Sequence, residues 1–232
     1  MYRKIAKMLE ELRNKIDFFI RNNTKFSRKN FEEKDEILLK INERENLYIQ
    51  DILEQFFSKR IKRDTYVLDI GSKNWFYAKG EYKFFKSFCK EMYLDGVELD
   101  AYRLYSNFYS RYEVSKYYIR GLENTSYIAG NVLDIKKEYD YIIWILPFVV
   151  IEPLIRWGLP RKYFCPEKLL SQAYKILNKD GQMLIINQGE EEKEEQKELL
   201  KILNIPYEYK GKVKSKFYDY KIERFAYLIN KK

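Results

Sequence analysis

The sequence contains no histidine and is poor in glycine, cysteine and proline, with 9, 2 and 5 of these among its 232 residues. Without histidine there is no Ser-His-Asp or Cys-His nucleophile, no HExxH metal helix and no histidine general base. The two cysteines, Cys89 and Cys165, lack CxxC spacing and indicate neither a disulfide framework nor a cysteine metal site. We therefore expect chemistry that needs no metal and no histidine.

Long hydrophobic runs are also missing. The longest, residues 141–151, is about half of the ~20 residues that a membrane span needs. The first ten residues mix charged with apolar side chains and lack the apolar core of a signal peptide. We therefore expect a reduced, cytoplasmic protein with no membrane partner.

Positive charge exceeds negative charge, with 44 Lys and Arg against 35 Asp and Glu, a net charge of +9. The surplus is spread along the chain, which is more typical of a soluble surface than of a nucleic-acid footprint. A nucleic-acid partner is an alternative that the charge does not favour.

Residues 1–63 predict a helical N-terminal region. A first helix is expected over residues 1–22 and a second over residues 31–61, each with apolar side chains at helical spacing. The first helix carries its apolar stripe on Ile5, Leu9, Leu12, Ile16 and Phe19.

Residues 64–232 predict a second domain in which strands alternate with helices. Such alternation indicates a parallel sheet with right-handed crossovers, and two last strands without a helix between them indicate an antiparallel pair. We therefore expect an α/β fold with a seven-stranded, mostly parallel sheet that ends in an antiparallel hairpin. The expected strands are 66–70, 94–99, 126–130, 139–146, 182–186, 207–213 and 223–229, and the expected helices 82–88, 101–122, 167–177 and 190–203.

The expected strands end in polar residues, and ligands of open α/β sheets bind beyond such carboxyl ends. The segments concerned are Val67-Leu-Asp-Ile-Gly, Gly96-Val-Glu-Leu-Asp, Gly130-Asn-Val-Leu-Asp, Tyr139-Asp-Tyr-Ile-Ile and Ile176-Leu-Asn-Lys-Asp-Gly-Gln-Met-Leu-Ile. In this order and spacing they resemble the class I, Rossmann-like S-adenosylmethionine-dependent methyltransferases over residues 65–232.

The resemblance implies that Asp69 and Gly71, with Ser72 beside them, hold the methionine part of S-adenosylmethionine. A carboxylate can accept a hydrogen bond from the cofactor's ammonium group, and glycine lets the backbone approach closely. The resemblance also implies that Glu98, followed by Leu99, accepts the two ribose hydroxyls. An alternative for both carboxylates is that they cap the helices that follow.

Three further residues complete the implied cofactor site. Asn131 stands where the family often has an acid that reads the adenine amino group, and Val132 would present its backbone N–H nearby. Trp144 could cover the cofactor from the fourth strand. The alternatives are that Asn131 is an ordinary turn residue and that Trp144 belongs to the core.

The turn after the first strand departs from the family pattern. Lys73 and Trp75 stand where the family usually has glycine. We expect either a turn that bends differently, with Asn74 in the left-handed conformation, or weak or lost cofactor binding.

The segment after the fourth strand concerns the methyl acceptor. Amino-methylating relatives begin this segment with a hydrogen-bonding side chain, and Ile145 cannot accept such a bond. Phe148 could stack on a planar substrate, and Arg156 and Trp157 lie in the loop 152–166, where the family places substrate contacts. The same loop could be a surface loop anchored by its aromatic side chains, and no catalytic base can be chosen.

The sequence therefore predicts an S-adenosylmethionine-dependent methyltransferase whose acceptor is unidentified, with a small molecule favoured. One alternative is a non-catalytic scaffold or binding module with the same fold, and another is an RNA- or DNA-directed methyltransferase. The helical region 1–63 is expected to act as a lid, as part of the substrate site or as the contact of a homodimer.

Overall fold

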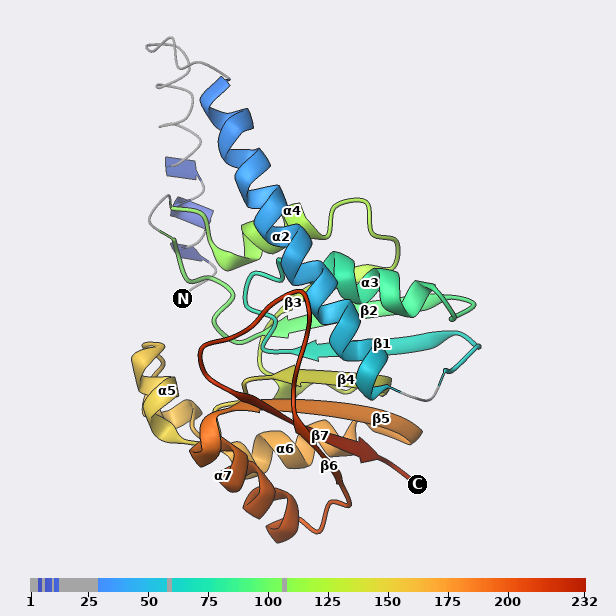
Figure 1. Ribbon diagram of the computed structural model, residues 1–232. Coiled ribbons are helices and arrows are strands. Elements are labelled where there is room, and N and C mark those ends of the chain that lie inside the picture. Colours follow the sequence, from blue (N-terminus) through green and yellow to red (C-terminus); the bar gives the residue numbers. More distant parts are fainter. Residues whose placement is uncertain (1–3, 6, 10, 13–28, 58–59, 106–107) are drawn as a thin grey trace.

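The computed structural model describes residues 4–5, 7–9, 11–12, 29–57, 60–105 and 108–232. Its centre is a seven-stranded sheet with the order β3-β2-β1-β4-β5-β7-β6 (Figure 1). Strands β1 to β5 run parallel, and β7 is antiparallel to both of its neighbours, which confirms the expected sheet. The strands are Thr65–Ile70 (β1), Met92–Glu98 (β2), Thr125–Ala129 (β3), Tyr139–Ile145 (β4), Leu177–Gln188 (β5), Glu208–Lys212 (β6) and Arg224–Asn230 (β7).

Helices cover both faces of the sheet, so the molecule has three layers. In Figure 1, α2 and α3 lie above the sheet, and α6 and α7 lie below it. The helices are Lys29–Phe56 (α2), Ala78–Lys86 (α3), Arg111–Tyr118 (α4), Ile151–Arg156 (α5), Pro166–Lys175 (α6) and Gly189–Ile202 (α7), with short 3-10 helices at Val132–Asp134 (η1) and Arg161–Tyr163 (η2).

Each face of the sheet has its own hydrophobic core, because successive side chains of a strand point to opposite faces. Val67 of β1 and Ile143 of β4 pack with α2 and α3, whereas Leu68 and Ile142 pack with α6 and α7. The α2 side chains in the first core are Tyr48, Ile49, Ile52, Leu53 and Phe56. The C-terminal half of α2 therefore shares a core with the sheet.

Three elements differ from the sequence prediction. The helix expected over 101–122 is only α4, because Ser110 and Glu113 form a capping box that starts the helix at Arg111. Helix α5 lies inside the segment expected to be a loop. Strand β5 begins at Leu177, within the expected helix end, where Asp180 donates its N–H to the Lys231 carbonyl at 2.8 Å.

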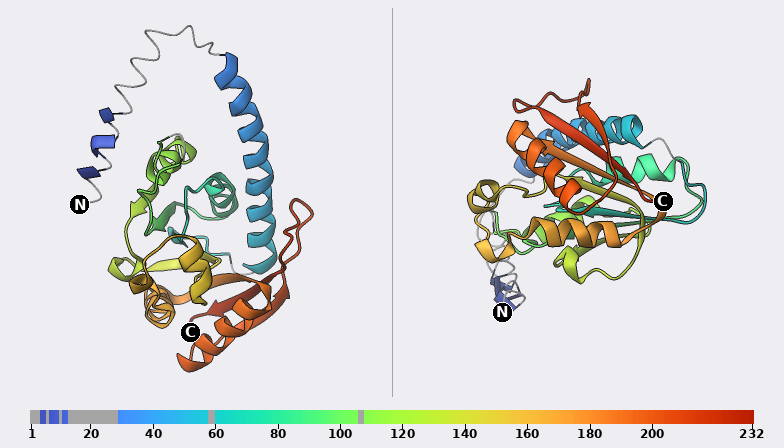
Figure 2. Two further views of the ribbon diagram at one scale, coloured as in Figure 1. Left: turned by 90° about the vertical axis from the view of Figure 1, so that its left-hand side faces the viewer. Right: turned by 90° about the horizontal axis from the view of Figure 1, so that it is seen from below.

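The expected first helix falls mostly outside the described residues. Those described between residues 4 and 12 are helical, and Ile5 and Leu12 of the expected stripe are exposed there. The stripe members Ile16 and Phe19 lie outside the described part. Figure 2 shows α2 as one long rod whose first turns extend beyond the sheet. No helix within the described ranges is both long enough and apolar enough to cross a membrane.

Two glycines allow close packing near the turn that connects β1 to α3. At Gly80 of α3, a Cβ would collide with Ile49 and the Asn46 carbonyl, so α2 can lie directly against α3. The Asn46 side chain also accepts a hydrogen bond from the Gly80 N–H at 2.5 Å. At Gly96 of β2, a Cβ would stand 2.9 Å from the indole of Trp75. The core on the α2 and α3 face of the sheet is therefore tightly packed next to the β1–α3 turn.

We predict that Gly96→Ala lowers the free energy of unfolding by about 1–3 kcal/mol, since the added methyl group overpacks the site of the Trp75 indole. Urea unfolding measures the change. Gly130→Ala is a matched control, because the nearest atom to a Cβ there is 3.9 Å away. Equal unfolding midpoints for the two variants would contradict the packing described.

Candidate functional site

The turn from β1 to α3 keeps a glycine-like backbone without the usual glycines. Lys73 and Trp75 have φ values of 56° and 52°, both left-handed, whereas Asn74 does not have a positive φ. The expectation of a left-handed Asn74 was therefore wrong. Left-handed geometry costs roughly 1–2 kcal/mol per residue for an L side chain. Contacts of Lys73 and Trp75 must offset this cost.

Trp75 is anchored by burial and by one hydrogen bond. Its side chain is fully buried against Gly96, and its indole N–H donates to Glu81 Oε2 at 2.8 Å. Lys73 is anchored through its backbone, because its N–H donates to Glu98 Oε2 at 2.9 Å and its carbonyl accepts from the Tyr127 hydroxyl. Hydrogen bonds thus connect the turn to both β2 and β3.

Asp69 and Glu81 form a buried acidic pair next to this turn. Burial raises the pKa of Asp69 well above its usual range, and the charge of Glu98 adds to the shift. Burial also raises the pKa of Glu81, followed by the charge of Asp69. Tyr77 donates its hydroxyl to Asp69 Oδ2 at 2.9 Å, which opposes the shift at Asp69.

Several polar atoms of this region have no partner among the described residues. They are Asp69 Oδ1, Ser72 Oγ, Asn74 Oδ1 and Glu81 Oε1, all buried. Buried polar groups without partners are uncommon in native proteins and are frequently explained by a ligand or water. Gly71, with φ of 74°, faces open space where a Cβ would stand. The turn therefore offers unpaired polar groups next to accessible room.

Glu98 ends β2 beside the turn and is buried. Its Oε1 accepts from the Asp100 N–H at 2.7 Å, and its Oε2 accepts from Lys73 as described. Burial raises the pKa of Glu98, while its hydrogen bonds and the Arg111 charge oppose that shift. The end of β3 lies alongside, since the Gly130 N–H donates to the Glu98 carbonyl at 3.0 Å.

A basic and aromatic group surrounds Glu98. The Arg111 guanidinium is 3.8 Å from Glu98 Oε1 and 3.3 Å from Asp100 Oδ2. The Trp157 indole lies against two cations, with the Arg111 Cζ 4.6 Å and the Lys73 Nζ 5.3 Å from its centroid. The segment after β4 thus reaches the ends of β1 and β2 through Trp157.

The structure brings together only some of the residues predicted from sequence. Asp69, Gly71, Ser72 and Glu98 meet at the carboxyl ends of β1 and β2, where the Gly71 and Ser72 N–H groups donate to the Val97 carbonyl. Leu99 follows Glu98 and is 37% exposed.

Asn131 and Val132 follow β3. The Asn131 side chain accepts from the Leu133 N–H at 3.0 Å, which caps the short helix η1, and Val132 is buried. The side-chain oxygen of Asn131 thus already holds one local bond, and its role toward adenine stays a prediction.

Trp144 lies in the core on the α6 and α7 face of the sheet, where it lines a small cavity with Phe148. Its role as a cover for a cofactor stays a prediction. Phe148 also approaches Trp157, with 6.4 Å between the ring centroids. Arg156 is exposed. Of the three predicted substrate residues, Trp157 is the one in contact with the turn and with Arg111.

Sequence reasoning missed Arg111, Tyr77 and Glu81. Arg111 lies in a segment expected to be one continuous helix, and no sequence motif indicates that it belongs to the site. Glu81 and Tyr77 lie in the segment that follows the turn, where helical spacing of the aromatic residues drew attention to the core instead. Lys73 was noticed only as a departure from the glycine pattern.

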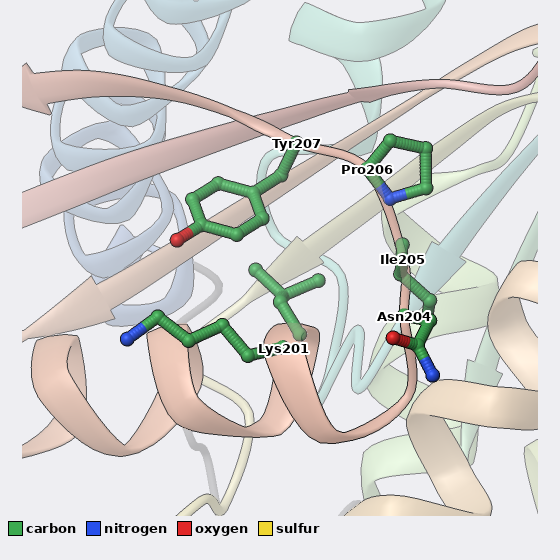
Figure 3. A pocket seen from close by; sticks show the side chains of 6 residues that line it. Lys201, Asn204, Ile205, Pro206 and Tyr207 are labelled. Atoms are coloured by element: carbon green, nitrogen blue, oxygen red, sulfur yellow. The ribbon is translucent and has the colours of Figure 1, made fainter.

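The open hollow shown in Figure 3 is not part of this site. It is lined by Lys201, Asn204 and Tyr207 together with Leu200, Ile205 and Pro206. These residues join the end of α7 to the start of β6, at the edge of the sheet opposite to the carboxyl ends of β1 and β2. No group of three or more acidic or cysteine side chains in the described ranges could hold a metal ion.

The acidic pair predicts an unusual pH dependence of stability. The folded protein raises the pKa of Glu81 above its ordinary value of 4.5, so above that pH the folded state holds a proton that the unfolded state has lost. This contribution lowers the free energy of unfolding as the pH rises from 4.5 toward the raised pKa. Glu81→Gln removes the titration and should make the slope less negative.

Urea unfolding at several pH values measures this slope. The control is Glu167→Gln, which changes an exposed side chain of α6 and should leave the slope as it is in the wild type. A Glu81→Gln slope equal to that of the wild type would show that Glu81 is not held protonated by its surroundings.

No protein-family model matches the sequence, and no curated protein sequence matches it significantly. Solved structures do match the fold. A methyltransferase from Aquifex aeolicus that depends on S-adenosylmethionine is 15% identical, with a TM-score of 0.55 over 84% of this chain and 97% of that one. Precorrin-6y C5,15-methyltransferase from Geobacter metallireducens is 11% identical, with a TM-score of 0.51 over 75% of this chain and 83% of that one.

A third match was solved with bound S-adenosylmethionine. It is phosphoethanolamine N-methyltransferase 2 from Haemonchus contortus, 16% identical, with a TM-score of 0.51 over 80% of this chain and 52% of that one. At these identities the likeness concerns the fold. This chain has the Rossmann-like fold of the class I S-adenosylmethionine-dependent methyltransferases.

Proposed function

We propose that the protein binds S-adenosylmethionine at the carboxyl ends of β1 and β2 and transfers its methyl group. The observation that carries the proposal is the set of buried, unpartnered oxygens of Asp69 and Ser72 next to open space at Gly71. An ammonium donor fits the free Asp69 oxygen, because carboxylates accept such bonds. The residues present therefore suit the methionine end of this cofactor.

Glu98 retains the capacity to bind ribose. A carboxylate offers about four acceptor positions, and the N–H groups of Lys73 and Asp100 use two of them. Two vicinal hydroxyls could use the rest, as the acid at the end of the second strand does in dinucleotide folds. Leu99, Asn131 and Val132 would then border the base.

The bound cofactor would supply a methyl group activated by its sulfonium. Methyl transfer depends chiefly on holding the acceptor in line at short distance, which positioning can achieve without histidine. In this chain the turn would fix the cofactor's ends, and Phe148 and the α5 segment would border the acceptor. We assign no catalytic base, because no described side chain is placed to be singled out for that role.

The acceptor is a separate question. The matched structures act on different acceptors, a precorrin in one case and phosphoethanolamine in another. Fold likeness therefore does not select an acceptor. We keep a small molecule as the favoured class, with RNA or DNA as the alternative that the spread charge does not favour.

We also propose that residues 1–63 act as an accessory region of the catalytic domain. Support comes from the C-terminal half of α2, which packs on α3 and holds the Gly80 N–H through Asn46. This contact would steady the helix that follows the cofactor turn. A contribution to a homodimer is the other role that we keep for the region.

A non-catalytic binding module is the second candidate. It is favoured by the crowding around Glu98. The Lys73 N–H and the Arg111 guanidinium stand close to the carboxylate that would take the ribose, and the Trp157 indole lies against the side chains of both residues. A module of this kind would keep the fold without binding the cofactor. Measurement of cofactor binding separates the two candidates directly.

Isothermal titration calorimetry with S-adenosylhomocysteine tests the proposal. We expect the wild type to bind at micromolar concentrations. Glu98→Ala should weaken binding at least about tenfold, or about 1.4 kcal/mol, because it removes the ribose acceptor. Asp134→Ala is the control. Asp134 is an exposed carboxylate near Asn131, and it is not among the residues proposed to bind the cofactor.

Glu98 also holds the turn, so its removal could unfold the protein. A thermal melt of each variant guards against this, and Asn131→Ala provides a second, less disruptive loss of affinity. No heat from the wild type at millimolar S-adenosylhomocysteine would overturn the methyltransferase proposal and leave the binding module.

A further inference from the structure

Three cations, Arg103, Arg111 and Lys73, gather around the carboxylates of Glu98 and Asp100. Arg103 donates to Asp100 Oδ2 at 2.5 Å, and Arg111 approaches the same oxygen at 3.3 Å. Asp100 thus serves two guanidinium groups. Glu98 accepts two backbone N–H groups and stands 3.8 Å from Arg111. The charges of Glu98 and Glu45 act on the third cation, Lys73, without a direct ion pair among the described residues.

The Lys73 ammonium group has no ion-pair partner within the described ranges, although the side chain is partly buried. Burial and the neighbouring Arg111 charge lower the pKa of Lys73, and the charges of Glu98 and Glu45 oppose that shift in part. A partly buried ammonium group without a carboxylate in direct contact is stabilised less than one that has such a contact. Lys73 is therefore placed to gain from the arrival of a negative charge.

Arg111 is also incompletely paired. It is 3% exposed, and its Nε is buried with no hydrogen-bond partner among the described residues. The Tyr105 hydroxyl lies beside Arg111. Burial raises the pKa of Tyr105, and the charge of Arg111 and a hydrogen bond with it oppose that shift. A guanidinium with an unpaired Nε–H, a neighbouring phenol and an ammonium group are a suitable set of donors for an oxyanion.

The face of the Trp157 indole is an aromatic surface that Lys73 and Arg111 share. Both Lys73 and Arg111 lie within cation–π distance of its ring. The neighbouring Gly158, with φ of 78°, lets the backbone pass close to the Arg103 guanidinium, which would stand 3.1 Å from a Cβ there. The α5 segment thus approaches all three cations through two consecutive residues.

We propose that Lys73 and Arg111 form a binding site for an anionic group, phosphate or carboxylate, and that the Trp157 indole occupies this place until the anion displaces it. Two cations attract a full negative charge between them more strongly than they attract the partial negative charge of an aromatic face. The assignment of this anion to the methyl acceptor rests on the proposed function, whereas the anion site itself does not.

The site predicts a class of acceptor. An anchored phosphate or carboxylate would orient a small acidic molecule next to the cofactor turn, and such orientation is the main aid that methyl transfer needs. A single, largely buried subsite on one turn and one helix suits one acidic group better than an extended polyanion, whose binding uses a row of exposed cations.

Tryptophan fluorescence during titration with inorganic phosphate or with acetate tests the proposal, with sodium chloride used to keep ionic strength constant. We expect a saturable change with at least one anion. The change should be absent in Trp157→Phe, which identifies the reporter among the three tryptophans. Lys73→Met should weaken the affinity for the anion at least fivefold, and Lys73→Arg should retain the affinity.

The matched control is Lys79→Met, which removes an exposed lysine of α3 and should bind the anion as the wild type does. A response to phosphate alone assigns a phosphorylated acceptor, and a response to acetate assigns a carboxylated one. No saturable response to either anion, or equal affinity in Lys73→Met and the wild type, would overturn the site.

Calorimetry with S-adenosylhomocysteine on the same samples keeps the two proposals apart. Anion binding without S-adenosylhomocysteine binding would support the proposal of the anion site and overturn the proposal of a methyltransferase. Nucleoside binding without anion binding would retain the methyltransferase and reject the anion site.

Discussion

Burial of the Trp75 indole against the bare backbone of Gly96 is the contact on which the geometry of the site depends. It holds a left-handed residue in the turn after β1, where a glycine would adopt that conformation at little cost. The hydrogen bond from Lys73 to Glu98 holds the second such residue. Together they keep the turn close to the ends of β1 and β2 and leave Gly71 beside open space.

The same packing explains the electrostatics. Because the turn packs into the core on the α2 and α3 face, Asp69 and Glu81 are buried with no ion-pair partner among the described residues, and burial raises their pKa values. The cations gather instead on the other side of Glu98, where Arg111 and Lys73 meet Trp157. The site thus has an acidic side, where the ammonium group of a ligand would compensate the charge of the buried carboxylates, and a basic side, suited to an acidic ligand.

Much of this could be predicted from the sequence, because alternating strands and helices define the sheet and the residues at strand ends follow from it. The positions of Asp69, Gly71 and Glu98 at the ends of β1 and β2 follow in this way, and their roles toward a cofactor stay a prediction. The left-handed Lys73 and Trp75 could not be predicted, since their conformation depends on a distant glycine in β2. Arg111 was equally hidden, because a local capping box at Ser110 decides where α4 starts and so where that side chain lies.

The central claim is that the carboxyl ends of β1 and β2 hold S-adenosylmethionine. A crystal structure of the protein grown with saturating S-adenosylhomocysteine tests it most directly. The account predicts the ribose hydroxyls within hydrogen-bond distance of the Glu98 carboxylate and the amino group beside Asp69. Ligand density at another place, or an unchanged turn with no ligand density, would contradict it.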